Sequence, residues 1–375
     1  NRDMNSETPL EMVLAVIALI AVAAVCVVLV WNHVRVRRLS KQVERLRSER
    51  QLLVDRVDQL KTQVDEQSED AAGRHEVALV INPVKNRADE VRKQVLAAAR
   101  DMGMGEVLVL ETTEEDPGTQ MAADAKAAGV RVVIAAGGDG TVRTVAEQLV
   151  GTDVRLGIVP MGTGNLLARN LDLPITDFGA CIAAALNGTT KTIDTLDVRL
   201  EGEDGERHRH TAVVIGGVGL DAEVMGDTRD DLKAKAGWIA YGEAGLRHLL
   251  GDRQDATITM DGGSPRRYKV RSVLVANCGT LQGGLELLPD AKPDDGLLDV
   301  MVLSPRHVLD WARIAANTLV GHRVKIPVME TLQGTRVQVR FDKPIVSQLD
   351  GDSTGEVVGI DARLVADSLT VMLPR

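Results

Sequence analysis

The amino-acid sequence predicts an α/β domain with a parallel sheet, followed by a β-sandwich domain and preceded by a membrane helix and a coiled coil. Three patterns support this prediction. Apolar strand-like runs alternate with helical segments over residues 75–186, apolar and polar residues alternate over much of 187–375, and an unbroken apolar stretch covers 12–31. The first pattern is typical of βαβ units, the second of antiparallel strands, and the third of a bilayer-spanning helix.

Length, charge and cysteine content restrict the class of protein. The chain has 375 residues, which is enough for two domains with sizeable cores. Its net charge of −10 argues against a general nucleic-acid binder, because such proteins usually carry a basic surface. The three cysteines, Cys26, Cys181 and Cys278, are far apart in the sequence. They indicate neither a disulfide framework nor a metal-ligand cluster, and a reducing compartment fits them.

Residues 12–31 are predicted to form a single transmembrane helix. The stretch is about 20 residues long, which matches the hydrocarbon thickness of a bilayer. Acidic residues precede it and basic residues follow it. The positive-inside rule therefore places residues 1–11 outside the cell membrane and the remainder of the chain in the cytoplasm. A cleaved signal peptide is the alternative, although the basic start and the shorter apolar core of such a peptide are missing.

Residues 33–67 show the heptad pattern of a coiled coil. Leucine occupies one core position and valine the other, at Leu39, Leu46, Leu53, Leu60, Val43, Val57 and Val64. Valine combined with leucine at these positions favours two strands, so a homodimeric stalk is predicted. The alternative is a single charged helix that lies on the inner leaflet.

Residues 75–186 are predicted to form the α/β nucleotide-binding domain. The predicted strands are 77–81, 107–110, 130–136 and 156–160, and the predicted helices are 88–102, 119–128, 142–149 and 166–170. Ligands of parallel sheets bind at the carboxyl ends of the strands. Asn82, the pair Thr112 and Thr113, and the run Gly137–Thr141 all follow directly after predicted strands.

The run Gly137-Gly138-Asp139-Gly140-Thr141 has the composition of a phosphate-binding turn. Glycine lets a phosphate approach the backbone closely, and the N–H groups at the start of the next helix attract anions. We expect Thr141 to cap that helix. The Asp139 carboxylate would repel a bare phosphate, so it suggests a bridging metal ion or a hydrogen-bonded hydroxyl or water. The alternative is a tight structural turn with a capping threonine.

A second glycine-rich turn, Met161-Gly162-Thr163-Gly164-Asn165, follows the next predicted strand. Two such turns in neighbouring βα units favour a phosphate site over a coincidence. Together with Asn82-Pro83, the two turns resemble the diacylglycerol kinase catalytic-domain family, which includes sphingosine, ceramide and bacterial lipid kinases. The resemblance covers roughly residues 75–373. Val84-Lys85-Asn86 departs from the small, Ser/Gly-containing tail that usually follows Asn-Pro in this family.

The resemblance implies a nucleotide domain like those of NAD kinases and diacylglycerol kinases, with ATP and Mg²⁺ as cofactors. It also implies the nucleotide-binding residues, which are Asn82, Pro83, Thr113, Gly137, Gly138, Asp139, Gly140, Thr141, Gly162, Thr163 and Asn165. Asp139 is expected to hold the catalytic Mg²⁺ as well, directly or through water.

Residues 187–375 are predicted to form a β-rich lipid-substrate domain, with the option that the extreme C-terminus returns to the first domain. The predicted strands are 192–198, 211–215, 256–260, 268–276, 297–303 and 337–341, and the predicted helices are 230–250 and 305–319. Alternating patterns between Gly, Asp and Pro turns are typical of an antiparallel sandwich.

Two further stretches of this domain resemble motifs of the same family. Gly216–Ala222 is similar to a Gly-x-Gly-Phe-Asp-Ala turn, and Lys292–Leu297 is similar to a loop that binds a structural Mg²⁺ in bacterial members. By position, the metal ligands would be the Asp295 carboxylate and the carbonyls of Lys292 and Leu297, which are oxygen ligands that suit Mg²⁺. The alternative is a plain Asp-Gly turn.

Asp350-Gly351-Asp352 is similar to the family's Asp-Gly-Glu motif, whose Glu is the proposed general base. The resemblance therefore implies Asp352 as the catalytic base, with a side chain one carbon shorter. Glu356 is an alternative base, and a plain hairpin turn is the structural alternative.

The sequence therefore predicts a membrane-anchored kinase that transfers the ATP γ-phosphate to a lipid hydroxyl in the bilayer. The family default for the acceptor is diacylglycerol, which would give phosphatidic acid. The alternatives are an NAD kinase-like enzyme with a soluble substrate and an inactive, membrane-tethered scaffold.

Overall fold

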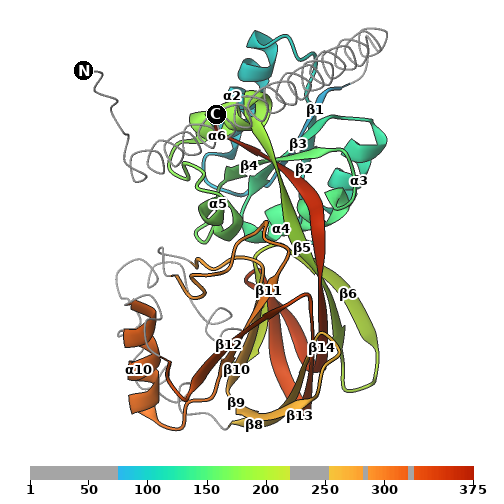
Figure 1. Cartoon of the computed structure of the whole chain (residues 1–375). Helices are drawn as coiled ribbons and strands as arrows, with labels where there is room; N and C mark the ends of the chain where they lie inside the picture. Colours follow the sequence, from blue (N-terminus) through green and yellow to red (C-terminus); the bar gives the residue numbers. More distant parts are fainter. Residues whose placement is uncertain (1–74, 220–252, 282–285, 320–324) are drawn as a thin grey trace, which may run out of the picture. The chain divides into compact units, whose positions relative to one another are not determined.

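The computed structural model of the chain describes residues 75–219, 253–281, 286–319 and 325–375 (Figure 1). The predicted transmembrane helix at 12–31, the predicted coiled coil at 33–67 and the predicted helix at 230–250 lie outside the described residues. Of the helices in the described ranges, none has the length and apolar character needed to cross a membrane.

The first domain contains four parallel strands in the order β4-β3-β1-β2, which are one end of a 14-stranded sheet that continues into the second domain. Its strands are β1 (Val77–Ile81), β2 (Leu108–Glu111), β3 (Val132–Gly137) and β4 (Arg155–Pro160). The helices are α2 (Ala88–Asp101), α3 (Thr119–Ala127), α4 (Asp139–Leu149), α5 (Leu166–Asn170) and α6 (Phe178–Asn187). Strands β1 and β3 are buried over their whole length, as their apolar β-branched residues predict. The predicted parallel sheet is confirmed.

The helix after the first glycine-rich turn begins earlier than expected. Helix α4 starts at Asp139 with Gly138 as its N-cap, so the prediction that Thr141 caps this helix is wrong. Thr141 instead lies in the first helical turn and is buried beneath Gly137, where an added Cβ would lie 2.6 Å from the Thr141 Oγ1. Glycine at position 137 therefore makes room for the threonine.

The second domain is a β-sandwich-like arrangement of mostly antiparallel strands. The strands are β5 (Thr189–Glu201), β6 (Arg207–Ala212), β7 (Ile215–Gly219), β8 (Gln254–Met260), β9 (Arg266–Val270), β10 (Ser272–Ala276), β11 (Leu298–Leu303), β12 (Met329–Gly334), β13 (Arg336–Leu349) and β14 (Asp352–Leu373). Helix α10 (Val308–Leu319) accompanies them. Valine, leucine and isoleucine side chains from these strands form a hydrophobic cluster of their own, which provides the core of this domain.

Three predicted elements of this domain are corrected by the structure. The run 211–215 is divided between β6 and β7, because Val213 and Val214 donate their backbone N–H groups to the Asp350 carboxylate and leave the strand ladder. The run 268–276 is divided between β9 and β10, which pair with different strands. Residues 216–219, expected in a turn, lie in strand β7. Side chains at Gly216 and Gly217 would collide with the facing leucines, which explains the glycines there.

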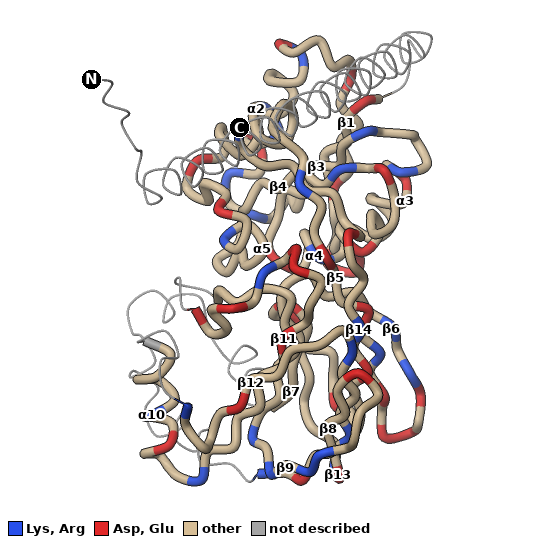
Figure 2. The backbone as a smooth tube through the Cα atoms, viewed as in Figure 1, with Lys and Arg blue, Asp and Glu red and all other residues tan. Residues whose placement is uncertain are grey.

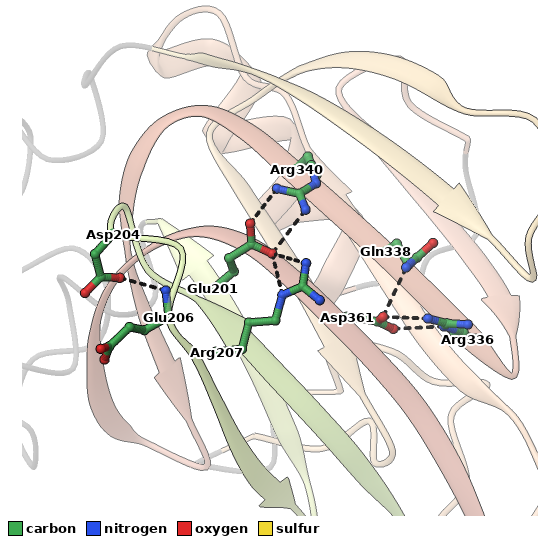
Figure 3. A network of polar contacts seen from close by, with 8 residues as sticks. All are labelled: Glu201, Asp204, Glu206, Arg207, Arg336, Gln338, Arg340 and Asp361. Carbon is green, nitrogen blue, oxygen red and sulfur yellow. Dashed lines mark hydrogen bonds and ion pairs between the residues drawn. The ribbon is translucent and has the colours of Figure 1, made fainter.

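The outer face of β5, β6, β13 and β14 carries ion pairs that connect neighbouring strands (Figure 3). Glu201 accepts hydrogen bonds from both Arg207 and Arg340, and Asp361 accepts from Arg336 and Gln338. The guanidinium of Arg340 is the main cause that lowers the pKa of Glu201. Each exposed pair of this kind contributes only about 0–1 kcal/mol to folding stability. The charged side chains on this face therefore form a structural network between neighbouring strands.

Strands β5 and β14 are long enough to belong to both domains (Figure 1). They pair antiparallel along most of their length, and β14 also pairs in parallel with β4 of the first sheet at Val371 and Leu156. At its other end β14 begins beside the first domain, because Asp352 accepts a hydrogen bond from Arg143 of α4 at 2.8 Å. This arrangement brings the two predicted halves of the site together.

Candidate active site

The loops at the carboxyl ends of β1, β3 and β4 lie side by side. Asn82, directly after β1, donates its backbone N–H to the carbonyl of Ala136 at 3.0 Å, and Met161, directly after β4, donates to Gly137 at 2.8 Å. The first glycine-rich turn therefore lies between the Asn-Pro loop and the second glycine-rich turn, as the order of the strands requires. The first N–H groups of an α-helix have no backbone acceptor within the helix, so the start of α4 is suited to attract an anion.

Asp139 connects the two glycine-rich turns. Its carboxylate accepts hydrogen bonds from the backbone N–H groups of Asn165, at 2.8 Å, and Leu166, at 2.5 Å. Burial raises the pKa of Asp139, the N–H groups of Leu166 and Asn165 act in the opposite direction, and the nearby Asp352 adds to the increase. The carboxylate thus stabilises the start of α5 and fixes the second turn beside the first.

Asn165 organises the second turn from within. Its backbone has a left-handed conformation with φ 49°, its side-chain Oδ1 accepts from the Gly162 N–H, and its Nδ2 donates to the Gly162 carbonyl. Arg169 adds a hydrogen bond from Nε to the Gly164 carbonyl at 2.7 Å. Since both ends of its amide are engaged within the turn, Asn165 acts here as a structural residue of the site.

We expect Gly162→Ala to destabilise the protein, because its Cβ would lie 2.8 Å from the Gly138 Cα. Backbone atoms cannot move aside cheaply, so the free energy of unfolding should fall by roughly 1–3 kcal/mol in urea denaturation. Gly138→Ala is the matched control, because its Cβ would have 3.6 Å to the Gly162 Cα. Equal stability of the two variants would contradict the close approach of the turns.

Asp352 lies against the first glycine-rich turn. A Cβ added to Gly140 would be 3.0 Å from the Asp352 Oδ2, so a larger residue there would require this carboxylate to shift by a few tenths of an ångström. The Arg143 Nη2 donates to the same oxygen at 2.8 Å. The Arg143 side chain is only 13% exposed, and its buried Nε has no hydrogen-bond partner among the described residues. Arg143 was not among the predicted site residues, although it follows Asp139 by one helical turn and therefore lies on the same face of α4.

Asp350 fixes the turn that carries Asp352. It is buried, and its carboxylate accepts the backbone N–H groups of Val213, Val214 and Ile215 at 2.9, 2.9 and 2.8 Å. Burial raises the pKa of Asp350 to about 6, against the opposing effect of these N–H groups. A local sequence pattern could not reveal this role, because the partners of Asp350 lie about 136 residues earlier in the chain.

Glu356, the alternative base, is placed differently. It lies on β14 opposite Val346 and is exposed. Asp352, in contrast, lies beside Gly140 and accepts a hydrogen bond from Arg143 at 2.8 Å. The geometry therefore favours Asp352 as the group that faces the glycine-rich turn.

Three further predicted nucleotide-binding residues lie beside the two glycine-rich turns or after β2. Pro83 and Thr163 are exposed, in the Asn-Pro loop and the second turn respectively. Thr113 is exposed after β2, and its hydroxyl accepts the Asp116 N–H at 3.1 Å. Its neighbour Thr112 is buried and has a hydroxyl without a partner among the described residues.

The predicted metal loop, Lys292–Leu297, lies in the second domain and is held by a buried aspartate. Asp194 accepts the Gly296 N–H at 2.9 Å, and its own N–H donates to the Pro293 carbonyl at 2.7 Å. The Asp295 carboxylate is exposed and accepts the Leu297 N–H through Oδ1. Within the described ranges, no three His, Cys, Asp or Glu side chains converge on one point. One carboxylate with carbonyls and waters is nevertheless a donor set that fits Mg²⁺.

Charges of both signs are interspersed over the described parts of both domains (Figure 2).

Comparison with known proteins places the two domains in characterised families. Residues 76–198 match the diacylglycerol kinase catalytic domain, and residues 196–373 match the YegS C-terminal NAD kinase beta sandwich-like domain. The chain is 28% identical to a diacylglycerol kinase of Bacillus subtilis over 287 residues, which covers 75% of this chain and 91% of the relative. It is 33% identical over 286 residues to a protein of Pseudomonas aeruginosa named "Probable lipid kinase YegS-like", covering 72% of this chain and 87% of that protein.

A solved structure has the same fold. The crystal structure of a diacylglycerol kinase from Bacillus anthracis aligns with a TM-score of 0.56 at 19% identity, over 80% of this chain and 97% of that one. The likeness therefore extends across both domains of the described structure.

Proposed function

Because the chain belongs to the diacylglycerol kinase catalytic-domain family, we propose that it transfers the γ-phosphate of ATP to the hydroxyl group of a lipid. The observation that carries this proposal is the position of Asp352 beside Gly140, with 3.0 Å between its Oδ2 and a Cβ added at Gly140. A carboxylate is thereby aimed at the turn where the phosphates would bind. The names of the relatives support a lipid as the acceptor.

Phosphoryl transfer depends mainly on positioning and on stabilisation of charge. The backbone N–H groups of residues 137–141 would hold the nucleotide phosphates, with Asn82, Thr113 and Thr163 completing the nucleotide site. Asp352 would accept the proton of the lipid hydroxyl or orient it, and Arg143 holds its Oδ2 in place. Asp139 keeps the two turns in register.

Magnesium would neutralise charge on the phosphates when it is bound. Both Asp139 oxygens accept backbone N–H groups, yet each carboxylate oxygen has a second lone-pair site, so a contact through water stays a prediction. Asp295 with the carbonyls of Lys292 and Leu297 would hold a structural Mg²⁺, which is also a prediction.

The predicted N-terminal segment is the basis for the proposed location of the enzyme at the membrane. A transmembrane helix at 12–31, with the catalytic domains on the cytoplasmic side, would keep the enzyme close to an acceptor that stays in the bilayer. A coiled coil at 33–67 would make the enzyme a homodimer. Diacylglycerol is the proposed acceptor and phosphatidic acid the proposed product.

The test is an assay of the full chain in mixed micelles with radiolabelled ATP, Mg²⁺ and diacylglycerol, sphingoid bases or polyprenols as acceptors. Mass spectrometry should detect phosphatidic acid. NADP from NAD without any phospholipid would instead establish an NAD kinase. A folded protein that phosphorylates no acceptor would favour the scaffold alternative.

Gly138→Ala is expected to fold normally and to bind ATP at least tenfold more weakly. The added Cβ has only ordinary contacts with the protein, at 3.6 Å or more, so stability should be retained. The methyl group would occupy the surface that the phosphates approach, and a tenfold loss corresponds to about 1.4 kcal/mol. Isothermal titration with ATP measures the loss, and unchanged affinity would place the phosphates elsewhere.

A further inference from the structure

The Asn-Pro loop folds tightly after β1 and directs one lysine toward the glycine-rich turn. Asn82 holds the loop: its Oδ1 accepts the Val84 N–H at 3.2 Å, and its carbonyl accepts the Lys85 N–H at 3.3 Å. The Lys85 carbonyl in turn accepts the Ala88 N–H at 3.1 Å, which leads into α2. The backbone around Lys85 is therefore fixed on both sides.

The ammonium group of Lys85 lies over Gly138. A Cβ added at Gly138 would be 3.9 Å from both the Cε and the Nζ of Lys85. Gly138 is the N-cap of α4, at the point where the first free N–H groups of this helix are exposed to an anion. A positive charge and a helix N-terminus therefore converge on the same small volume.

Lys85 has no negative partner in the described part of the chain. Its half-buried side chain forms neither a hydrogen bond nor an ion pair with any described residue. The other cation of the loop is already engaged, because Arg87 pairs with Glu90 at 2.7 Å and lies 4.7 Å above the Phe178 ring. An unpaired ammonium at an anion cradle lacks the ligand that would neutralise it.

We propose that Lys85 binds a phosphate oxygen of the nucleotide held at Gly138. The inference rests on the proposed function and adds a ligand to it: the ammonium supplies a full positive charge that the backbone N–H groups cannot provide. This role would explain why Val84-Lys85-Asn86 differs from the small-residue tail that follows Asn-Pro in the family. Lys85 would thereby compensate for the absence of the Ser/Gly-containing tail, because its ammonium group lies over Gly138.

The test compares nucleotide affinities of the full chain in detergent micelles by isothermal titration with ATP, ADP and adenosine. Lys85→Gln and Lys85→Met should weaken ATP and ADP binding about 10–100-fold, as expected for a hydrogen bond to a charged group. Adenosine binding should stay unchanged, and Lys85→Arg should restore most of the affinity. The loss should shrink as salt is added, because a charge interaction is screened.

Lys93→Gln is the matched control, since Lys93 is an exposed lysine on α2 of the same domain. It should bind all three ligands like the unchanged protein. Wild-type affinity for ATP in Lys85→Gln would overturn the inference while leaving the proposed function intact. An equal loss for adenosine and ATP would also overturn it, because the effect would then be structural. Absence of ATP and ADP binding in the unchanged protein would overturn the proposed function itself, and the inference with it.

Discussion

Replacing Asp352 by asparagine is expected to lower the turnover of lipid phosphorylation by about 10²–10⁴-fold. The amide has nearly the same shape, so it can stay beside Gly140 and near Arg143, yet it cannot take a proton from the acceptor hydroxyl. ATP affinity should change little, because the proposed role of this carboxylate is on the acceptor hydroxyl, while backbone N–H groups would hold the nucleotide phosphates. Turnover in mixed micelles and ATP titration of the same preparation separate the two effects.

Glu356→Gln is the control for this experiment. It removes the other carboxylate that the sequence offers as a base, and it lies on an exposed part of β14. Its turnover should match that of the unchanged protein. The opposite result, in which Glu356→Gln loses turnover and Asp352→Asn keeps it, would assign the base to Glu356.

Replacing Asp139 by alanine is expected to reduce stability and activity together. The N–H groups of Asn165 and Leu166 would lose their shared acceptor, and an unsatisfied buried donor costs about 1–3 kcal/mol. The free energy of unfolding should therefore fall by roughly 2–6 kcal/mol, measured by urea denaturation. The second turn would then be free to move away from the first, and turnover should fall with it.

Asp139→Asn distinguishes the two roles considered for this residue. The amide oxygen can still accept one of the two N–H groups, so part of the stability should be retained. Asp101→Asn, at the exposed end of α2, controls for loss of a carboxylate in the same domain. If Asp139→Asn unfolded like the unchanged protein but lost all turnover, Asp139 would act on Mg²⁺ rather than on the turns.

The first domain was largely predictable because its signals are local. Apolar β-branched runs become buried parallel strands, and glycine clusters mark the ends where the strands pass into helices. The start of α4 was placed too late because Thr141 looks like a cap in sequence. The packing of its side chain beneath Gly137 is visible only in three dimensions.

The residues that complete the site could not be predicted because their partners are distant in sequence. Arg143 and Asp352 are 209 positions apart, and the contact depends on the exact register of β13 and β14. Likewise, Lys85 was interpreted as a departure from a motif, since only the fold of the Asn-Pro loop shows where its ammonium lies. The break between β6 and β7 has the same origin, because a remote carboxylate competes with the strand ladder for N–H groups.

The pairing of β5 with β14 has a mechanical consequence. Kinases that close on their nucleotide often rotate two lobes about a flexible hinge. Here the connection between the lobes is a two-stranded ladder whose pairing shifts between Val365 and Leu369, where Asp194 accepts the Asp367 N–H at 2.8 Å. If the two domains moved relative to each other, they would have to twist this irregular segment, because no flexible linker connects them in the described residues. We therefore expect any closure around the nucleotide to be a torsion of small amplitude at this shift in the ladder.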